Sequence, residues 1–476
     1  MVVSRGLATS PAVVIAIALL VGVGSGLAAL MDSPLVPPVV LAAIGIVAVT
    51  LRVPIAGVFA FVLIASLLPF AVLPVRVVFA LTLTDLALTA LLVAWLARLL
   101  RRREALVRTA VDAPLIVFVV VAIVAFVLGT AHSPTPGETF RLFLKLINST
   151  LLFFGATQVV RSQPDLARVT CTLIVGGAAA AMLALALYVL PGEGALDILG
   201  GLGALGYPTG PDVLRPLAGT ETLRATGTSV DPNLMGGLLM IAGTLAVAQL
   251  LATQPVLTRP WLIALVLPIL GVMPLTYSRS AWVGLAAGVG FLALFRERKA
   301  WALIGLAIAA LLALPQGQTV LARLGSGLAA SDQASVMRLD EYRNAFQIIQ
   351  RYPMLGIGFG DAPDVDLTAG VSSIYLLLAE QVGLVGLACF LSAVGLALWL
   401  SFRAHIPRDG QLGGLVSGLQ AALVAALVAG LFDHYFVSIR FPHMVALFWL
   451  LVALLLVATG LAVERNAQLT RTEMRQ

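Results

Sequence analysis

Glu380 is the one carboxylate in VSSIYLLLAEQVGLVGL, an otherwise apolar stretch from Val371 to Leu387. An ionised carboxylate that faces lipid is costly, so we expect Glu380 to face the interior of a helix bundle and to find a partner there. One interpretation is a general base, or a group that holds an arginine beneath a bound acceptor. The other is a hydrogen-bonded carboxyl that fixes helix packing. Whether Glu380 belongs to a functional site stays open between these two interpretations. A packing role is favoured over a role as the catalytic base itself.

Arginines supply the second kind of chemistry, because a guanidinium is always charged and can bind two phosphate oxygens at once. Four arginines, Arg224, Arg279, Arg338 and Arg343, stand in the motifs that are described below. The alternative is that an arginine at a helix end reaches lipid headgroups. Anion binding is favoured for Arg279 and Arg338, Arg224 stays open, and headgroup contact is favoured for Arg343, as it is for Arg215, Arg351 and Arg440.

The composition determines which elements must position these residues. The chain has 476 residues, of which 60% are hydrophobic and only 11% are charged, and its mean hydropathy is +1.04. Apolar runs of about 18 or more residues recur along it, each long enough to cross a hydrocarbon layer of ~30 Å as a helix. A soluble protein would need more polar surface than this. The sequence therefore predicts an all-α, polytopic integral membrane bundle.

The predicted bundle has about 12–14 transmembrane helices. Fourteen candidate spans are found, at 11–30, 35–51, 54–73, 83–99, 113–130, 140–160, 170–190, 234–252, 260–277, 280–295, 300–315, 373–401, 411–432 and 440–463. The second and third are short and could form one re-entrant pair. The first lacks a small-residue cleavage site, so we interpret it as a retained span and not as a signal peptide.

The distribution of charge predicts the orientation. With the N-terminus inside, most of the 29 Lys and Arg residues fall inside, notably in 95–108, 161–168, 296–299 and 464–475, while most of the 23 acidic residues fall outside. This asymmetry places both termini in the cytoplasm. The net charge of +6 is thus a topology signal, and no nucleic-acid partner is expected because the basic residues do not gather on one face.

Two long segments, 191–233 and 316–372, are predicted to face outward and to have room for a folded site. Within the second, residues 337–350 have helical spacing, with an apolar face of Leu339, Tyr342, Phe346 and Ile349. This pattern predicts an amphipathic helix at the membrane surface or over the mouth of a cavity. No cluster has metal-ligand spacing, and Asp361, Asp364 and Asp366 are interpreted as a solvated loop. We therefore expect neither a metal nor another cofactor.

Four motifs, in the same order and on the same side, resemble the O-antigen ligase and O-antigen polymerase superfamily of bacterial envelope glycosyltransferases. Residues 224–239, RATGTSVDPNLMGGLL, are similar to its Arg-x-x-Gly-Thr-x-x-x-Pro-Asn motif, and 275–285, LTYSRSAWVGL, resemble its Ser-Arg-x-x-Trp turn. Residues 338–360 match an amphipathic helix that ends in Pro-x-x-Gly-x-Gly. In the opening stretch, Ser373, Gly383 and Gly386 fit a His-(Asn/Ser/Gln)…Gly-x-x-Gly block. The resemblance covers about 220–390.

The chain departs from the family at one position. Ser372 stands where ligases of this family carry the histidine, and a hydroxyl cannot accept a proton near neutral pH as an imidazole does. His434, in FDHYFVSIRFPH (432–443), therefore becomes a candidate substitute base, although a solvated loop histidine is the more common reading of such a residue. Ser372, Ser373 and Tyr375 join Arg224 and Arg343 as candidate contacts to diphosphate or glycan, and Arg279, Arg338, Glu380 and His434 are the candidate catalytic residues.

The resemblance implies a metal-independent glycosyltransferase in the cytoplasmic (inner) membrane, with its active site facing outward. Its donor would be an oligosaccharide linked to polyprenyl diphosphate, and its acceptor a glycan, a lipid or a protein, among membrane lipids. Because the histidine is missing, polymerisation of repeat units is favoured over ligation of a finished glycan. A transporter or flippase of lipid-linked glycans is the rival of another class. A cell-wall glycosyltransferase of the shape and division family, which uses the same lipid carrier, is a further rival.

Overall fold

The computed structural model describes residues 35–73, 81–101, 106–132, 136–190, 192–210, 213–217, 222–313, 318, 321–323, 325, 333–361, 369–404, 406 and 410–473. The first half of this part contains the helices α2 (Val36–Arg52), α3 (Ile55–Leu67), α4 (Leu83–Leu100), α5 (Asp112–His132), α6 (Gly137–Val159), α7 (Gln163–Val189) and α8 (Gly192–Gly201). The second half contains α9 (Pro232–Leu251), α10 (Arg259–Val272), α11 (Arg279–Phe291), α12 (Ala300–Ala313), α14 (Gln333–Arg351), α15 (Ile374–Arg403), α16 (Gln411–Ala429) and α17 (Pro442–Glu473).

The predicted all-α membrane bundle is confirmed. Nine helices in the described ranges are long and apolar enough to cross a membrane, and α2, α3 and α12 are shorter apolar helices. The predicted spans from 35–51 onward each coincide with a helix, whereas 11–30 lies outside the described residues. The possible re-entrant pair consists of two separate helices, α2 and α3. The helix α8 has no counterpart among the predicted elements.

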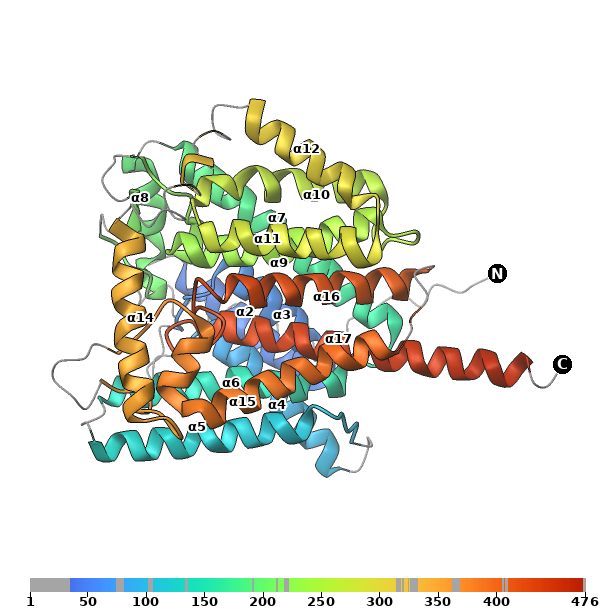
Figure 1. The fold of residues 1–476 in the computed structure, drawn as a ribbon, viewed down its shortest axis with the longest axis horizontal. Coiled ribbons are helices and arrows are strands. Elements are labelled where there is room, and N and C mark those ends of the chain that lie inside the picture. Colours follow the sequence, from blue (N-terminus) through green and yellow to red (C-terminus); the bar gives the residue numbers. More distant parts are fainter. Residues whose placement is uncertain are drawn as a thin grey trace.

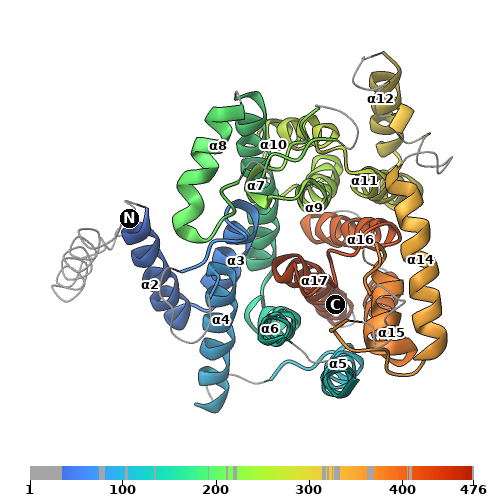
Figure 2. The same cartoon turned by 90° about the vertical axis from the view of Figure 1, so that its left-hand side faces the viewer.

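The helices are sorted by burial into a centre and a rim. In α9, α16 and α17, between 83% and 89% of the apolar window is buried by other helices, compared with 28% in α5. Figure 2 looks down the bundle and shows α9, α16 and α17 near its middle, with α2, α5 and α12 at its edge. The exposed apolar residues of α5, such as Ile116 and Val120, are those that a lipid-facing helix would present to the bilayer.

α14 crosses one end of the bundle roughly at right angles to the spanning helices, and α8 lies at the same end (Figure 1). Hydrogen bonds of Glu341 and Tyr342 hold α14 there. The Glu341 carboxylate accepts from the backbone N–H of Ser372 at 3.0 Å, and the Tyr342 hydroxyl donates to the carbonyl of Leu431 at 3.1 Å. α14 is thereby attached both to the turn before α15 and to the turn after α16.

A break in α15 anchors the other end of α14. At Gly383 the backbone has φ 72°, so the helical hydrogen bonds are interrupted, and a Cβ at this position would overlap the carbonyl of Met354. The freed carbonyls of Glu380 and Gln381 accept from the N–H groups of Ile357 at 2.9 Å and Gly358 at 3.0 Å. The Pro-x-x-Gly-x-Gly segment and the Gly-x-x-Gly segment therefore form one packed unit, which fixes where α14 ends.

Candidate active site

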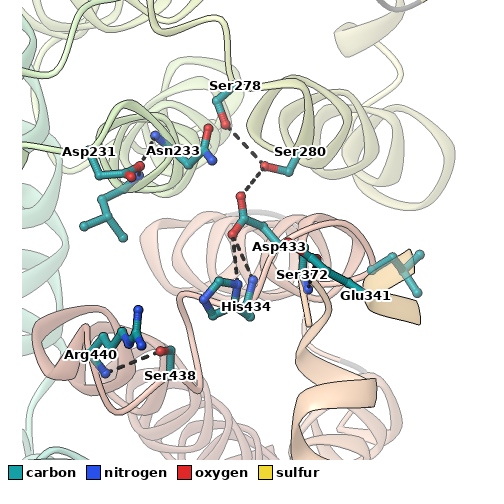
Figure 3. Close-up of polar contacts among 12 residues, drawn as sticks. Asp231, Asn233, Ser278, Ser280, Glu341, Ser372, Asp433, His434, Ser438 and Arg440 are labelled. Atoms are coloured by element: carbon teal, nitrogen blue, oxygen red, sulfur yellow. Dashed lines mark hydrogen bonds and ion pairs between the residues drawn. The ribbon is translucent and has the colours of Figure 1, made fainter. Parts of the chain in front are cut away.

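Three turns from distant parts of the chain meet at the end of the bundle that α14 crosses. They precede α9, precede α11 and join α16 to α17, and Figure 3 shows their polar residues facing one another. Ser278 and Ser280 share a hydrogen bond at 3.2 Å, and Ser280 donates to Oδ2 of Asp433 at 3.3 Å. Asp231 caps α9 by accepting from the N–H of Asn233 at 2.7 Å. These three turns, with Asp231, Asn233, Ser278, Ser280, Asp433 and His434, form what we call the platform.

Asp433 and His434 form the most notable pair of this platform. The Asp433 carboxylate is 8% exposed, whereas the His434 side chain is 30% exposed. Oδ1 of Asp433 accepts the backbone N–H of His434 at 2.9 Å and lies 3.7 Å from its Nδ1. Burial raises the pKa of Asp433, while the nearby charges of His434 and Arg338 act in the opposite direction. A buried carboxylate beside a half-exposed imidazole is an arrangement that can orient a general base.

Arg224 is fixed by two acceptors. Its Nε donates to the carbonyl of Thr276 at 2.9 Å, and its Nη2 donates to Oδ1 of Asn233 at 2.8 Å. Burial lowers the pKa of Arg224 to about 10, which leaves the guanidinium charged at the pH of a cell. Arg224 therefore ties the turn before α9 to the turn before α11, and it keeps a positive charge at the platform.

Arg279 and Arg338 belong to two different helices near the platform. Arg279 is the first residue of α11, next to Ser280, and it is half-buried. Arg338 lies on α14, is also half-buried, and acts electrostatically on Asp433. In the described part of the chain neither a hydrogen bond nor an ion pair is formed by the Arg338 side chain with a neighbour. Its charge is therefore carried at the rim of the platform, where an anion could contact it.

The other candidates divide into surface and packing residues. Arg343 makes an exposed ion pair with Asp340 at 3.0 Å. The Tyr375 hydroxyl donates to the carbonyl of Leu427 at 2.8 Å, so it links α15 to α16. Ser372 is half-buried and Ser373 is buried at the start of α15. The structure brings the Ser372 backbone to α14, through Glu341.

Glu380 is buried in α15, and its partner is a backbone group. Its Oε1 accepts the N–H of Gly370 at 2.6 Å, while Oε2 has no hydrogen-bond partner among the described residues. No ion pair joins Glu380 to an arginine in the described part of the chain, so the hypothesis that it holds an arginine gains no support there. Glu380 instead holds the segment that leads to Ser372, and Glu341 holds the same segment from the other side.

We predict that Glu380→Gln keeps transfer activity within a few-fold of wild type. The amide oxygen can still accept the N–H of Gly370, so the 370–373 segment stays in place. Glu380→Ala should lower both activity and folded yield, because it leaves a buried N–H without an acceptor. Activity is measured with purified protein at matched expression, and Glu138→Gln, at an exposed carboxylate on α6, is the control. A loss of about 100-fold in folded Glu380→Gln would mean that the charge itself acts in catalysis.

Metal ligation has no support in the described ranges. There, no group of three or more His, Cys, Asp and Glu residues could hold a metal ion. Asp361 is exposed, and Asp364 and Asp366 lie outside the described residues. His443, the second histidine of the 432–443 turn, is buried with its ring edge-to-face against Phe70 at 5.0 Å, so it is a packing residue.

Sequence reasoning missed three side chains at or near this platform. Ser280, Glu341 and Arg323 are not among the candidate residues that the sequence indicates. Arg323 lies over the ring of Tyr277, with its Cζ 5.4 Å from the ring centroid. Spacing along one segment could not reveal these pairings, because each joins turns that are distant in the sequence. The backbone gives one further indication of a functional site, which the sequence does not reveal. In the described part of the chain, Val230 and Tyr277 are the non-glycine residues with positive φ, and such strained residues often lie at functional sites.

Comparison with known proteins yields one informative match. No curated protein matches the chain significantly. One similar solved structure is titled "Structural coordination of polymerization and crosslinking by a peptidoglycan synthase complex". It shares 19% identity with this chain, and the match covers 74% of this chain and 98% of that one. The TM-score is 0.38, which is too low to assign a shared fold. Residues 263–391 match the model of the family described as O-Antigen ligase (Wzy_C). This match, over little more than a quarter of the chain, supports the O-antigen ligase and O-antigen polymerase superfamily, and the apolar helices show a multi-pass membrane protein.

Proposed function

We propose that this protein transfers a saccharide from a polyprenyl diphosphate carrier to an acceptor hydroxyl, at the outer face of the cytoplasmic membrane. The observation that carries the proposal is the convergence of cations and an Asp–His pair at one end of a bundle whose 263–391 region matches the ligase family. A leaving diphosphate needs fixed positive charge, and an attacking hydroxyl needs a proton acceptor.

The proposed reaction assigns one task to each group. His434 accepts the proton of the acceptor hydroxyl while that oxygen attacks the anomeric carbon of the donor sugar. A new carbon–oxygen bond forms to the acceptor as the bond to the diphosphate oxygen breaks, and the diphosphate leaves with both electrons of that bond. Arg279 and Arg338 hold its negative charge, and the buried Asp433 carboxylate stabilises the imidazolium of His434. This assignment needs no metal.

The arrangement of the basic segments supports an outward-facing site. Figure 1 shows the connection between α11 and α12 and the far end of α17 at the end of the bundle opposite α14. Those segments include 296–299 and 464–473, which the positive-inside rule assigns to the cytoplasm. The end with α14 and the platform would then lie outside, where lipid-linked glycans are presented.

Of the two reactions, we favour polymerisation, because Ser372 replaces the histidine that the resemblance assigns to ligases. The opposing argument is that the matched family is described as O-Antigen ligase. The two are distinguished by the products of purified protein in vesicles that contain one lipid-linked repeat unit. A polymerase uses the same molecule as donor and acceptor, so we expect a ladder of longer chains that remain on the lipid carrier. Product that forms only after a separate lipid or protein acceptor is added would show a ligase. Arg343→Ala, at the exposed ion pair, should leave the ladder unchanged.

A further inference from the structure

Two serine hydroxyls lead to the carboxylate that lies beside His434 (Figure 3). Ser278 and Ser280 are both buried, their Oγ atoms are 3.2 Å apart, and Oγ of Ser280 is 3.3 Å from Oδ2 of Asp433. An ionised carboxylate only accepts hydrogen bonds, so Ser280 gives its one hydroxyl proton to Asp433, and the bond between the serines is then donated by Ser278. The hydroxyls thus form a chain with one direction, which ends at Asp433.

Ser278 does not play the part that is usual for a serine at its position. It is the residue before α11, where a serine side chain commonly accepts an N–H group of the first turn and stabilises the helix. The Ser278 side chain makes no such bond. Its backbone N–H donates to Oγ1 of Thr276 at 3.3 Å, and Thr276 donates to the carbonyl of Met273 at 2.7 Å. The turn is therefore fixed with the Ser278 hydroxyl directed at Ser280 and not at the helix end.

Two adjacent glycines of α9 allow the serine turn and the Asp433 turn to approach each other. A Cβ at Gly236 would lie 2.8 Å from Cβ of Ser278, and a Cβ at Gly237 would lie 2.6 Å from the ring of Tyr435, the residue after His434. Glycine inside a helix costs stability relative to alanine, and close approach of a neighbouring segment is a physical reason to keep it. The glycine pair sets both turns against one stretch of α9.

We propose that Ser280 is a positioning residue, which holds Oδ2 of Asp433 towards α11 and thereby keeps Oδ1 beside the imidazole of His434. Oδ1 lies 3.7 Å from Nδ1 of His434 and accepts its backbone N–H at 2.9 Å. The inference rests on the proposed function for the task of His434 as proton acceptor. A carboxylate that is held in this orientation stabilises the imidazolium, and one that can rotate away does so less.

The test measures the reaction of His434 with diethyl pyrocarbonate in purified, detergent-solubilised protein over a range of pH, read by mass spectrometry of the peptide that contains it. The reagent modifies neutral imidazole, so the midpoint reports the pKa of His434. Ser280→Ala is expected to lower this midpoint by about one pH unit, because the imidazolium loses part of its stabilisation. In transfer assays the same variant should lower kcat about tenfold and leave KM unchanged, as the loss of one charge-assisted hydrogen bond would.

Two controls accompany Ser280→Ala. Ser66→Ala removes another buried hydroxyl, on α3, which donates to the carbonyl of Val62 at 2.8 Å, and it should change neither quantity. The second control is that Ser280→Ala leaves in place every other titratable group acting on Asp433. Among the described residues these are His434, Arg224, Asp231, Arg338, Tyr342 and Tyr435.

Gly236→Ala tests the same arrangement without removing a hydroxyl. The added Cβ would push Ser278 and the start of α11 away from α9, so we expect the midpoint and kcat to fall as they do in Ser280→Ala. Gly290→Ala, on α11, is the matched control, because a Cβ there would meet open space.

An unchanged midpoint with an unchanged kcat in folded Ser280→Ala would overturn the proposal. So would an equal loss of kcat in Ser66→Ala, which would show that any lost buried hydroxyl disturbs the bundle. If Ser280→Ala does not fold, the two measurements on Gly236→Ala decide the question. Failure of the proposed function would be distinct, because modification of His434 needs no substrate: its midpoint would depend on Ser280 in a protein that transfers no saccharide.

Discussion

Replacing His434 by alanine is expected to lower the rate of saccharide transfer by about 100-fold or more, the usual scale for a positioned proton acceptor. His434 is half-exposed at the platform, and its Nδ1 lies 3.7 Å from the buried carboxylate of Asp433. Asp433→Asn should produce a loss in the same direction, because an amide cannot stabilise an imidazolium as a carboxylate does. The rate is measured with purified protein in vesicles at saturating lipid-linked substrate.

His132→Ala is the matched control for this prediction. His132 is the last residue of α5 and does not belong to the three turns of the platform, so its loss should not change the rate. Binding of farnesyl diphosphate should survive His434→Ala, which would show that the variant is folded and that the defect lies in the chemical step. Wild-type rates in folded His434→Ala would remove this histidine from the mechanism.

Arg279→Lys and Arg338→Lys are each expected to lose most of the transfer activity although the positive charge is kept. An ammonium group cannot reproduce the two parallel hydrogen bonds of a guanidinium to phosphate oxygens. Losing one charge-assisted hydrogen bond costs about 1.5–3 kcal/mol, which corresponds to about 10- to 100-fold in rate. Initial rates over a range of substrate concentrations would separate a loss of ground-state binding from a loss of catalytic rate.

Arg343→Lys is the comparison for these two variants. Arg343 belongs to the same helix as Arg338, but its guanidinium pairs with Asp340 on the exposed surface, where such pairs contribute little. The variant should therefore keep full activity. If Arg279→Lys and Arg338→Lys matched Arg343→Lys at equal expression, the diphosphate would have to be held elsewhere.

The bundle was predictable because each spanning helix is a continuous apolar run bounded by polar residues. The end of α14 was predictable as well, since Pro353 cannot continue a helix. α8 was missed because four of its ten residues are glycines in the first and last turns, and glycine is a poor helix former. Local pattern therefore carries most of the fold.

The platform was predictable only in part. The motifs placed Arg224, Arg279 and Arg338 on one side of the membrane, and the structure brings their segments to one end of the bundle. Which groups pair there depends on contacts between distant turns. Ser280 meets Asp433 across 153 positions, and Glu380 meets a backbone N–H and not an arginine. No pattern within a single segment encodes such pairs.

The most direct test of the account counts the leaving group. Purified protein is reconstituted in vesicles with a polyprenyl-diphosphate-linked saccharide, and free polyprenyl diphosphate is quantified beside the new glycosidic bonds. The account predicts one polyprenyl diphosphate released for each bond formed by wild-type protein, and a release slowed about 100-fold or more in His434→Ala. Folded wild-type protein that binds the lipid-linked saccharide and releases no polyprenyl diphosphate, with every acceptor class supplied, would contradict it.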